Sequence, residues 1–349
     1  MDEPRSERSD ELVRHGWDDR WAALLDDAGI AGAEPGRVVR HDGVALTVAR
    51  RGGIGPVAIA RSIDPPPTIG DWVAVADEAA QAVLRRTTLL TRRSARGDAP
   101  QSLAANVDGV LVVCGLDRPV RGGRIDRFVT LAWDAGAVPT VVLAKADLVD
   151  DAEAVAAEVA AAHPGVEVIT ASVSAPGGTD AVAAVAAGRT VVLVGESGAG
   201  KSSLTNALLG GEVMATGAVR SGDAKGRHTT TTREAHPLPG GGVLIDTPGL
   251  RAVGLSADPD AVAATYADIE ELAEACRFSD CSHDVEPGCA VTAAVDAGDL
   301  AATRLAGWRA LEREAAAAEL RANPHLLRDR NRRFGRIARE AQRRKGRDR

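Results

Sequence analysis

Two patterns of apolar and polar residues divide the chain. Residues 138–143 (VPTVVL) and 190–194 (TVVLV) are rich in apolar, β-branched side chains, which is typical of parallel strands buried on both faces of a sheet. The second run leads through a glycine-rich loop into KSSLTNALLG, where apolar residues recur at helical spacing. The middle of the chain is therefore predicted to be an α/β domain with a parallel sheet.

Residues 36–98 instead alternate between apolar and polar positions in short stretches separated by Gly, Asp and Pro. This spacing predicts a small β-barrel, for which we choose an oligonucleotide-binding (OB) fold. The segment contains ten Arg and six acidic residues, a net charge of +4, whereas the whole chain carries −7. Trp72 is its sole aromatic residue and is expected to fill the barrel. RNA would therefore be bound through phosphates and shape; a purely structural barrel is the alternative.

The two ends of the chain differ in charge. Residues 1–16 are charged and lack an apolar core, and we expect a disordered acidic arm over residues 1–35. Residues 328–349 contain eleven basic and three acidic residues, a net charge of +8, which leaves −15 for the rest of the chain. An Arg-rich segment of this kind is typical of binding to nucleic-acid phosphates, and a surface or membrane-attracted helix is the alternative.

These patterns predict a multidomain α/β protein. After the arm come the barrel at 36–98, the α/β domain at 99–255, a helical metal-binding domain at 256–325 and a basic tail at 326–349. At 349 residues and 45% apolar content, the chain can bury a large core. No apolar run approaches the roughly 20 residues that span a bilayer, so no membrane partner is expected.

The loop GESGAGKS at residues 195–202 matches a phosphate-binding loop. Its glycines allow backbone N–H groups to surround phosphates, Lys201 would reach the outer phosphates, and the Ser202 hydroxyl would hold Mg²⁺. A glycine turn that matches by accident is the alternative. Only four of the chain's 42 basic residues are Lys, however, and a compact ammonium suits a phosphate cradle better than a guanidinium. The nucleotide-binding residues predicted here are Gly195, Glu196, Ser197, Gly198, Ala199, Gly200, Lys201, Ser202 and Ser203.

A second motif, Ala144-Lys145-Ala146-Asp147, follows the strand pattern at 138–143. The Asp147 carboxylate would accept two hydrogen bonds from the ring N–H and the exocyclic amine of guanine, which adenine does not offer. Lys145 would lay its stem along the base. Ala171, in the loop at 170–172, would contribute backbone contact to the guanine oxygen. A Lys-x-Asp triplet is common on protein surfaces, but its place at the end of a predicted strand favours nucleotide binding.

A third motif is DTPG at residues 246–249. Asp246 would bind Mg²⁺ through water, and the Gly249 N–H would sense the γ-phosphate. Leu250 follows at the place where many GTPases have the glutamine that orients the attacking water. Slow intrinsic hydrolysis is therefore expected unless another group positions the water.

The polar run GRHTTTT at residues 226–232 is the predicted mobile switch. His228 is the candidate for positioning water. Thr229 or Thr230 would cap Mg²⁺, with Thr230 preferred as the ligand. The alternative is a disordered polar loop, and without nucleotide both interpretations can hold.

The order of these motifs is unusual. An ordinary GTPase has the phosphate loop first and the base-reading motif last, whereas here the base motif precedes the phosphate loop and DTPG comes last. If all three are real, the α/β domain is a circularly permuted GTPase domain. DTPG then leads directly into the predicted metal-binding domain.

Three of the four cysteines lie in CRFSDCSHDVEPGC at residues 276–289. Three thiolates and one imidazole, from Cys276, Cys281, His283 and Cys289, make a closed tetrahedral set that predicts one structural Zn²⁺. Disulfides are the alternative, but the odd number of cysteines in this segment and the nucleotide motifs favour a reducing cytoplasm. Cys114, inside an apolar run, is expected to be an inert buried residue.

Together these features resemble one family, the bacterial small-ribosomal-subunit-dependent GTPases known as RsgA or YjeQ. The resemblance runs from residue 36 to the basic tail. It includes GDWV at 70–73, LAANVDGVLVV at 103–113, RHTTT at 227–231, the permuted motifs and the Cys/His segment. It implies an N-terminal OB-fold barrel, a central permuted GTPase domain and a C-terminal zinc domain. Ala144, where the family has Asn or Thr, departs from the pattern, as do the acidic arm and the Arg-rich tail.

The resemblance also implies a late assembly factor that binds the small ribosomal subunit and its rRNA, with GTP or GDP, Mg²⁺ and Zn²⁺ as ligands. The subunit would stimulate hydrolysis, and hydrolysis would be linked to release, with other assembly factors as further partners. A monomer is expected. One alternative is a guanine-nucleotide-regulated RNA-binding switch in which hydrolysis is incidental. Another is a structural RNA-binding protein with a vestigial nucleotide site, against which Lys201 and Ser202 count.

Overall fold

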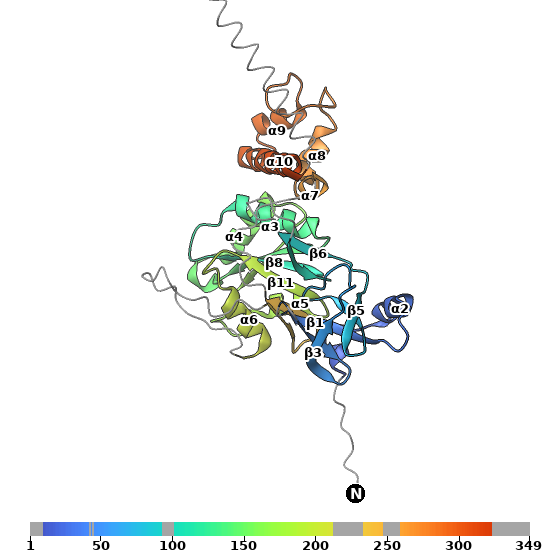
Figure 1. The fold of residues 1–349 in the computed structure, drawn as a ribbon. Coiled ribbons are helices and arrows are strands. Elements are labelled where there is room, and N and C mark those ends of the chain that lie inside the picture. The colour runs from blue at the N-terminus through green and yellow to red at the C-terminus, as the bar shows by residue number, and fades with distance from the viewer. Residues whose placement is uncertain are drawn as a thin grey trace, which may run out of the picture.

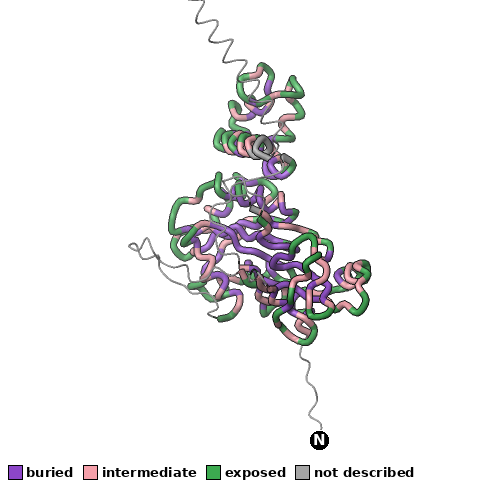
Figure 2. The backbone as a smooth tube through the Cα atoms, in the orientation of Figure 1, coloured by how far each residue is buried: buried purple, intermediate pink, exposed green. Residues whose placement is uncertain are grey.

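The computed structural model describes residues 10–41, 43, 45–92, 101–211, 233–246 and 259–322. A barrel, a central α/β domain and a helical C-terminal domain follow one another through the molecule (Figure 1). The most continuous stretch of buried backbone runs through the central sheet, as Figure 2 shows. Among the described residues, no helix combines the length and the apolar character needed to cross a membrane.

Five strands form the barrel: β1 (Glu34–His41), β2 (Leu46–Arg50), β3 (Gly53–Ile59), β4 (Trp72–Ala76) and β5 (Ala79–Val83). They pair in the order β1-β2-β3-β5-β4, and β1 also pairs with β4, which closes the sheet on itself. Val38, Leu46 and Val73 belong to the apolar cluster that the barrel encloses. The predicted OB-fold barrel is confirmed.

Two short helices, α1 (Glu11–Arg14) and α2 (Asp19–Asp27), cover one side of this barrel. Trp17 and Trp21 lie against Trp72, with ring centroids 4.9 and 5.7 Å apart. Trp72 therefore packs beneath the helices and does not fill the barrel, contrary to expectation. The expected disordered arm is also wrong for residues 10–35, because the tryptophans that follow the charged first residues form a small core with Leu12 and Trp72.

Six strands form the sheet of the α/β domain, in the order β10 (Glu167–Ala171), β9 (Val138–Ala144), β8 (Gly109–Gly115), β11 (Thr190–Gly195), β13 (Val243–Asp246) and β12 (Glu234–Pro237). Neighbouring strands are parallel except β12, which runs antiparallel to β13. Strands β9 and β11 are almost wholly buried, as the apolar runs at 138–143 and 190–194 predict. The base-motif strand β9 precedes the phosphate-loop strand β11 in the chain, so the predicted permuted order is present.

Helices cover both faces of this sheet. On one face α3 (Gly122–Asp134) and α4 (Ala152–Ala162) pack on the sheet, and on the other α5 (Asp180–Ala186) and α6 (Lys201–Leu209) do so. A hairpin of β6 (Leu89–Arg92) and β7 (Gln101–Ala105) connects the barrel to the sheet.

The barrel and the α/β domain are joined through β1. Strand β1 pairs with β12 at Arg40 and Glu234, which makes a continuous 11-stranded sheet. Arg37 of β1 is buried, donates hydrogen bonds to the His15 carbonyl and to Thr190 Oγ1, and lies over the Trp72 ring. Burial lowers the pKa of Arg37 to about 10, against the opposing influence of nearby acids. Arg37 therefore links the barrel to the α/β domain from inside the protein, and its side chain is not available to RNA.

The C-terminal domain contains α7 (Pro259–Thr265), α8 (Ala267–Ala273), α9 (Ala290–Ala297) and α10 (Ala302–Ala322). Its core includes Tyr266, Ile269 and Val291, all fully buried, together with Cys289. Figure 1 shows this domain on the side of the α/β domain where α3 lies, away from the barrel.

Candidate functional site

The predicted nucleotide motifs meet at one edge of the central sheet. Parallel strands β8, β9, β10 and β11 end at the same edge, where ligands of open α/β sheets bind. The base motif follows β9, the phosphate loop follows β11, and the loop with Ser172 follows β10. Pairing of Ala171 with Ala144 aligns the ends of β10 and β9.

The phosphate loop has the backbone that its glycines predict. Gly195 has φ +139°, and a Cβ placed there would lie 2.2 Å from the Val113 carbonyl oxygen, so no other residue fits. The loop then enters α6 at Gly200, whose left-handed backbone offers no side-chain cap to the first N–H groups of the helix. Uncapped N–H groups and the helix dipole favour an anion, so this cradle fits a nucleotide phosphate.

Lys201, Ser202 and Ser203 form the first turn of α6 and are half-buried. The Lys201 ammonium donates to the carbonyl oxygens of Gly195 and Glu196, at 2.8 and 2.6 Å. The lysine is thus folded over the loop that it is predicted to serve, and its positive charge lies inside the cradle. The remaining loop residues, Ser197, Gly198 and Ala199, connect these groups.

Asp147 lies in a 3₁₀ turn, Ala146–Leu148, that follows the end of β9. Its side chain accepts a hydrogen bond from Ser172 Oγ at 2.5 Å. The Ser172 backbone N–H donates to the Gly178 carbonyl, which anchors the second loop. The sequence placed Ser172 in this loop without a role, whereas the structure makes its hydroxyl the group that orients the base-reading carboxylate.

Lys145 connects the base motif to the phosphate loop. Its backbone is left-handed, with φ +62°, and its ammonium donates to the Gly198 carbonyl at 2.7 Å. The same ammonium lies 2.9 Å from Asp117, a residue that follows β8 and that the sequence motifs did not indicate. Its place directly after the apolar run that contains Cys114 is the one sequence signal that could have indicated it.

Several predicted residues lie outside the part of the chain that the structure describes. These are Gly249 and Leu250 of the third motif, and His228, Thr229 and Thr230 of the predicted switch. Asp246 is described and lies half-buried at the end of β13. Lys225 and the basic tail also fall outside the described residues.

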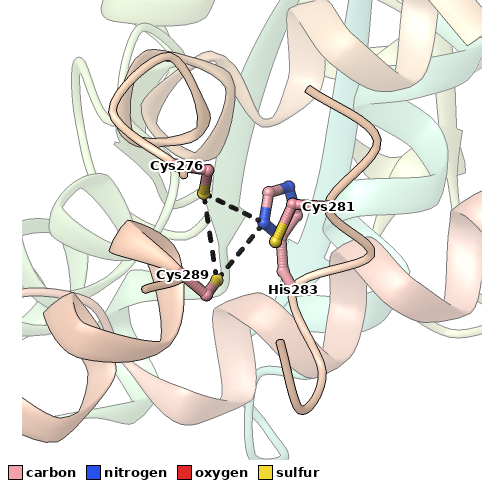
Figure 3. A group of neighbouring side chains, drawn as sticks. All are labelled: Cys276, Cys281, His283 and Cys289. Atoms are coloured by element: carbon pink, nitrogen blue, oxygen red, sulfur yellow. Dashed lines mark hydrogen bonds between the residues drawn. The ribbon is translucent and has the colours of Figure 1, made fainter. Parts of the chain in front are cut away.

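The four predicted metal ligands come together in the C-terminal domain (Figure 3). Their ligand atoms all lie within 4.8 Å of one another. Cys276 Sγ lies 3.9 Å from Cys289 Sγ and 3.6 Å from His283 Nδ1, and Cys289 Sγ lies 3.5 Å from that nitrogen. Thiolates about 2.3 Å from Zn²⁺ at tetrahedral corners are about 3.8 Å apart, so the set fits Zn²⁺. The cysteines are free of disulfides, contrary to the alternative.

Neighbouring groups donate hydrogen bonds to the cysteine sulfurs and change the pKa of their thiols. The N–H groups of Ala290 and Thr292 donate to the sulfurs of Cys276 and Cys289. Burial raises the pKa of the Cys289 thiol, but its hydrogen bonds with Thr292 and His283 outweigh burial and lower the pKa to about 6. Burial raises the pKa of the neighbouring Cys281 thiol to about 11, so Cys289, and not Cys281, is the sulfur held as the thiolate that metals bind.

The other cysteine, Cys114, is half-buried beside the phosphate loop. Burial, together with Glu196, raises the pKa of its thiol to about 12. It is therefore a neutral thiol at physiological pH, as an inert residue should be.

A buried ion-pair network joins the α/β domain to the C-terminal domain. Arg304 of α10 donates to both carboxylate oxygens of Asp268, at 3.0 and 2.8 Å, and to the Thr265 carbonyl at 2.7 Å. It also reaches Asp126 of α3 at 3.3 Å and lies over the Tyr266 ring. Asp126 in turn faces His163, at the end of α4. These contacts cross from α3, the helix after β8, to α10 of the C-terminal domain.

Comparison with known proteins agrees with this arrangement. The family described as RsgA GTPase matches residues 83–256. A Streptomyces coelicolor protein named small ribosomal subunit biogenesis GTPase RsgA is 45% identical over 350 residues, covering 95% of this chain and 96% of its own. A protein of the same name from Opitutus terrae is 42% identical over 337 residues, covering 90% and 92%.

Solved structures show the same fold. YjeQ from Thermotoga maritima superposes with a TM-score of 0.59 at 24% identity, covering 81% of this chain and 99% of its own. YloQ, described as a circularly permuted GTPase, superposes with a TM-score of 0.58 at 22% identity, covering 82% and 96%. From the fold, the motifs at the sheet edge and the close relatives, the chain belongs to the RsgA GTPase family and is a GTP-hydrolysing enzyme.

Proposed function

We propose that this GTPase acts in the maturation of the small ribosomal subunit, that the subunit and its rRNA stimulate hydrolysis, and that hydrolysis is linked to release. The observation that carries the proposal is the meeting of the phosphate loop and the base motif at one sheet edge. The names of the chain's relatives, which refer to small-subunit biogenesis, support the proposed role.

Each part of the site has a proposed role toward GTP. Lys201 binds the outer phosphates, and the N–H groups of residues 195–203 surround them. Ser202 and Thr230 would ligate Mg²⁺, and Asp246 would hold it through water. His228 positions the attacking water, which Leu250 is unable to do, and Gly249 senses the γ-phosphate.

The base motif accounts for the choice of guanine. Asp147, oriented by Ser172, accepts hydrogen bonds from the ring N–H and the exocyclic amine. Lys145 covers the base with its stem, and the loop at Ala171 contributes backbone contact to the guanine oxygen.

The permuted order supports a route from nucleotide to subunit. Strand β13 ends at Asp246 on the nucleotide edge, and the chain next enters α7 at Pro259, in the C-terminal domain. Arg304 connects α7 and α10 to Asp126 of α3. A change at the γ-phosphate therefore has a short covalent path to the C-terminal domain, which leads into the basic tail predicted to bind nucleic acid.

Steady-state GTP turnover, measured with and without purified small subunits, tests the proposal. We expect subunits to raise the rate about tenfold or more, because they complete a site that lacks its own water-orienting glutamine. Lys201→Ala should abolish both rates. Lys201→Arg should also impair them, since a guanidinium does not replace the ammonium in the cradle. Turnover that subunits leave unchanged would support the alternative, an RNA-binding switch in which hydrolysis is incidental.

The base assignment has its own test. Asp147→Asn exchanges an acceptor for a donor at the position that meets the guanine amine, so the preference should move from GTP toward xanthosine triphosphate. Competition between the two nucleotides in a binding assay measures this preference. Unchanged selectivity for GTP would refute the role of Asp147.

A further inference from the structure

The base motif of this chain lacks one side-chain hydrogen bond. Ala144 is buried at the end of β9, and its methyl group lies near the position that a Cβ on Gly200 would occupy, 3.6 Å away. An Asn or Thr at this place can form a hydrogen bond beside the phosphate loop, whereas a methyl group only fills space. The link between the base motif and the phosphate loop has to come from other side chains.

Asp117 and Arg118, in the loop after β8, make such a link. The Asp117 carboxylate lies 2.9 Å from the Lys145 ammonium and 2.9 Å from Arg118 Nη2. Both cations reach carbonyl oxygens of the phosphate loop, Lys145 at Gly198 and Arg118 at Ser197, at 2.7 and 3.4 Å. One carboxylate therefore holds two cations that each bind the loop.

The charge on this carboxylate is secure. Hydrogen bonds from Arg118 and Lys145 hold the pKa of Asp117 to about 2, well below its usual range. Lys145 has a left-handed backbone, which is unfavourable for a residue other than glycine and persists when surrounding contacts enforce it. Its contacts with Asp117 and Gly198 are such contacts, and they fix the side chain that is proposed to cover the base.

We propose that Asp117 is a positioning residue for guanine-nucleotide binding: it holds Lys145 and, through Arg118, the Ser197–Gly198 segment, in place of the hydrogen bond that Ala144 does not make. The inference rests on the proposed roles of the base motif and the phosphate loop. Asp117 would hold the site in its bound arrangement before the nucleotide binds. Binding is then stronger, because an ordered site loses less conformational freedom.

The expected effect is moderate, because these groups are partly exposed. The side chains of Asp117, Lys145 and Arg118 are 28%, 30% and 43% exposed, so water screens each ion pair. We expect Asp117→Ala to raise the Kd for GDP about three- to tenfold. Arg118→Ala should have a smaller effect, since the bond between Asp117 and Lys145 survives.

The experiment uses the full chain and titration with fluorescent GDP. Asp150→Ala is the matched control, because it removes another exposed acid shortly after the base motif. In the Asp117→Ala background, Ala144→Asn should restore the Kd to within about twofold of wild type, since it supplies the missing hydrogen bond by another route. In the wild-type background, Ala144→Asn should change the Kd little. Steady-state GTP turnover should show a raised KM with kcat unchanged for Asp117→Ala, which general damage to the fold would not produce.

Two results would overturn the inference. One is a Kd for Asp117→Ala equal to that of Asp150→Ala. The other is an Ala144→Asn effect that is the same with and without Asp117, because independent sites give additive effects. If the wild-type chain itself binds no GDP, the proposed nucleotide site fails and the inference fails with it. If the wild type binds GDP and Asp117→Ala binds equally well, only the inference fails.

Discussion

Replacement of Arg304 with Leu should loosen the C-terminal domain from the GTPase domain. The Arg304 side chain is 7% exposed, and its partners Asp126 and Asp268 are 9% and 24% exposed. Leucine has a similar apolar volume but leaves both carboxylates without their shared cation. Removing one partner of a buried ion pair costs about 3–5 kcal/mol, because the remaining charge stays out of water.

The loss of stability expected for Arg304→Leu lies near the lower end of that range. Asp268 is a quarter exposed and can regain water, and Asp126 keeps its contact with His163 at 3.3 Å. We therefore expect a loss of about 3 kcal/mol. Asp126→Asn should cost only about 1 kcal/mol, since Arg304 retains Asp268 and the Thr265 carbonyl.

Native-state hydrogen exchange measures this loss locally, which suits a protein of several domains. A loss of about 3 kcal/mol corresponds to amide exchange about a hundredfold faster in α7 and α10. Arg313→Leu is the control, because Arg313 lies on the same helix and is exposed. If the Arg304 and Arg313 variants exchange at the same rates, the ion-pair network does not hold the domains together.

Three further predictions concern stability and metal binding. Arg86→Met leaves the fully buried Asp71 without its bidentate partner, so hydrogen exchange in the barrel strands should report a local loss of about 3 kcal/mol, whereas substitution of the neighbouring exposed Arg85 by Met should cause none. The wild-type chain should contain one Zn²⁺ by elemental analysis, and Cys281→Ser should lose it; a metal-free wild type would contradict the site. Burial lowers the pKa of His163. Its hydrogen bonds to Asp126 and to the Val159 carbonyl raise the pKa by more than burial lowers it, so the net shift is upward. The stabilisation by protonated His163 is then complete below pH about 6.5 and declines as the pH rises through the raised pKa. His163→Gln should therefore flatten this part of the curve of stability against pH. An unchanged slope would refute the role of His163.

Local sequence patterns predicted the parts of this protein whose residues lie close together along the chain. The phosphate loop was recognisable because Gly195, Lys201 and Ser202 lie in one continuous segment, where the Lys201 ammonium donates to the backbone of its own loop. The Cys/His set was recognisable for the same reason, since four ligands lie within 14 residues of sequence. Buried strands such as β8 and β11 carry their apolar pattern in their own residues.

The N-terminal helices show where such patterns are insufficient. The charged first residues suggested disorder, yet Trp17 and Trp21 are ordered against Trp72, which lies more than fifty residues further along the chain. Neither segment shows by itself that it has a partner. Burial of the aromatic surface provides the stabilisation, and it exists only once the barrel has formed.

Local sequence predicts the buried strands β9 and β11, the permuted order of the nucleotide motifs and a candidate set of metal ligands, because periodicity and closely spaced donors are properties of continuous segments. Which distant polar groups meet depends on the tertiary fold: Asp117 with Lys145, Ser172 with Asp147, and Arg304 with Asp126. These pairs join separate elements, and their distances depend on how those elements pack. No periodicity along the chain records that packing.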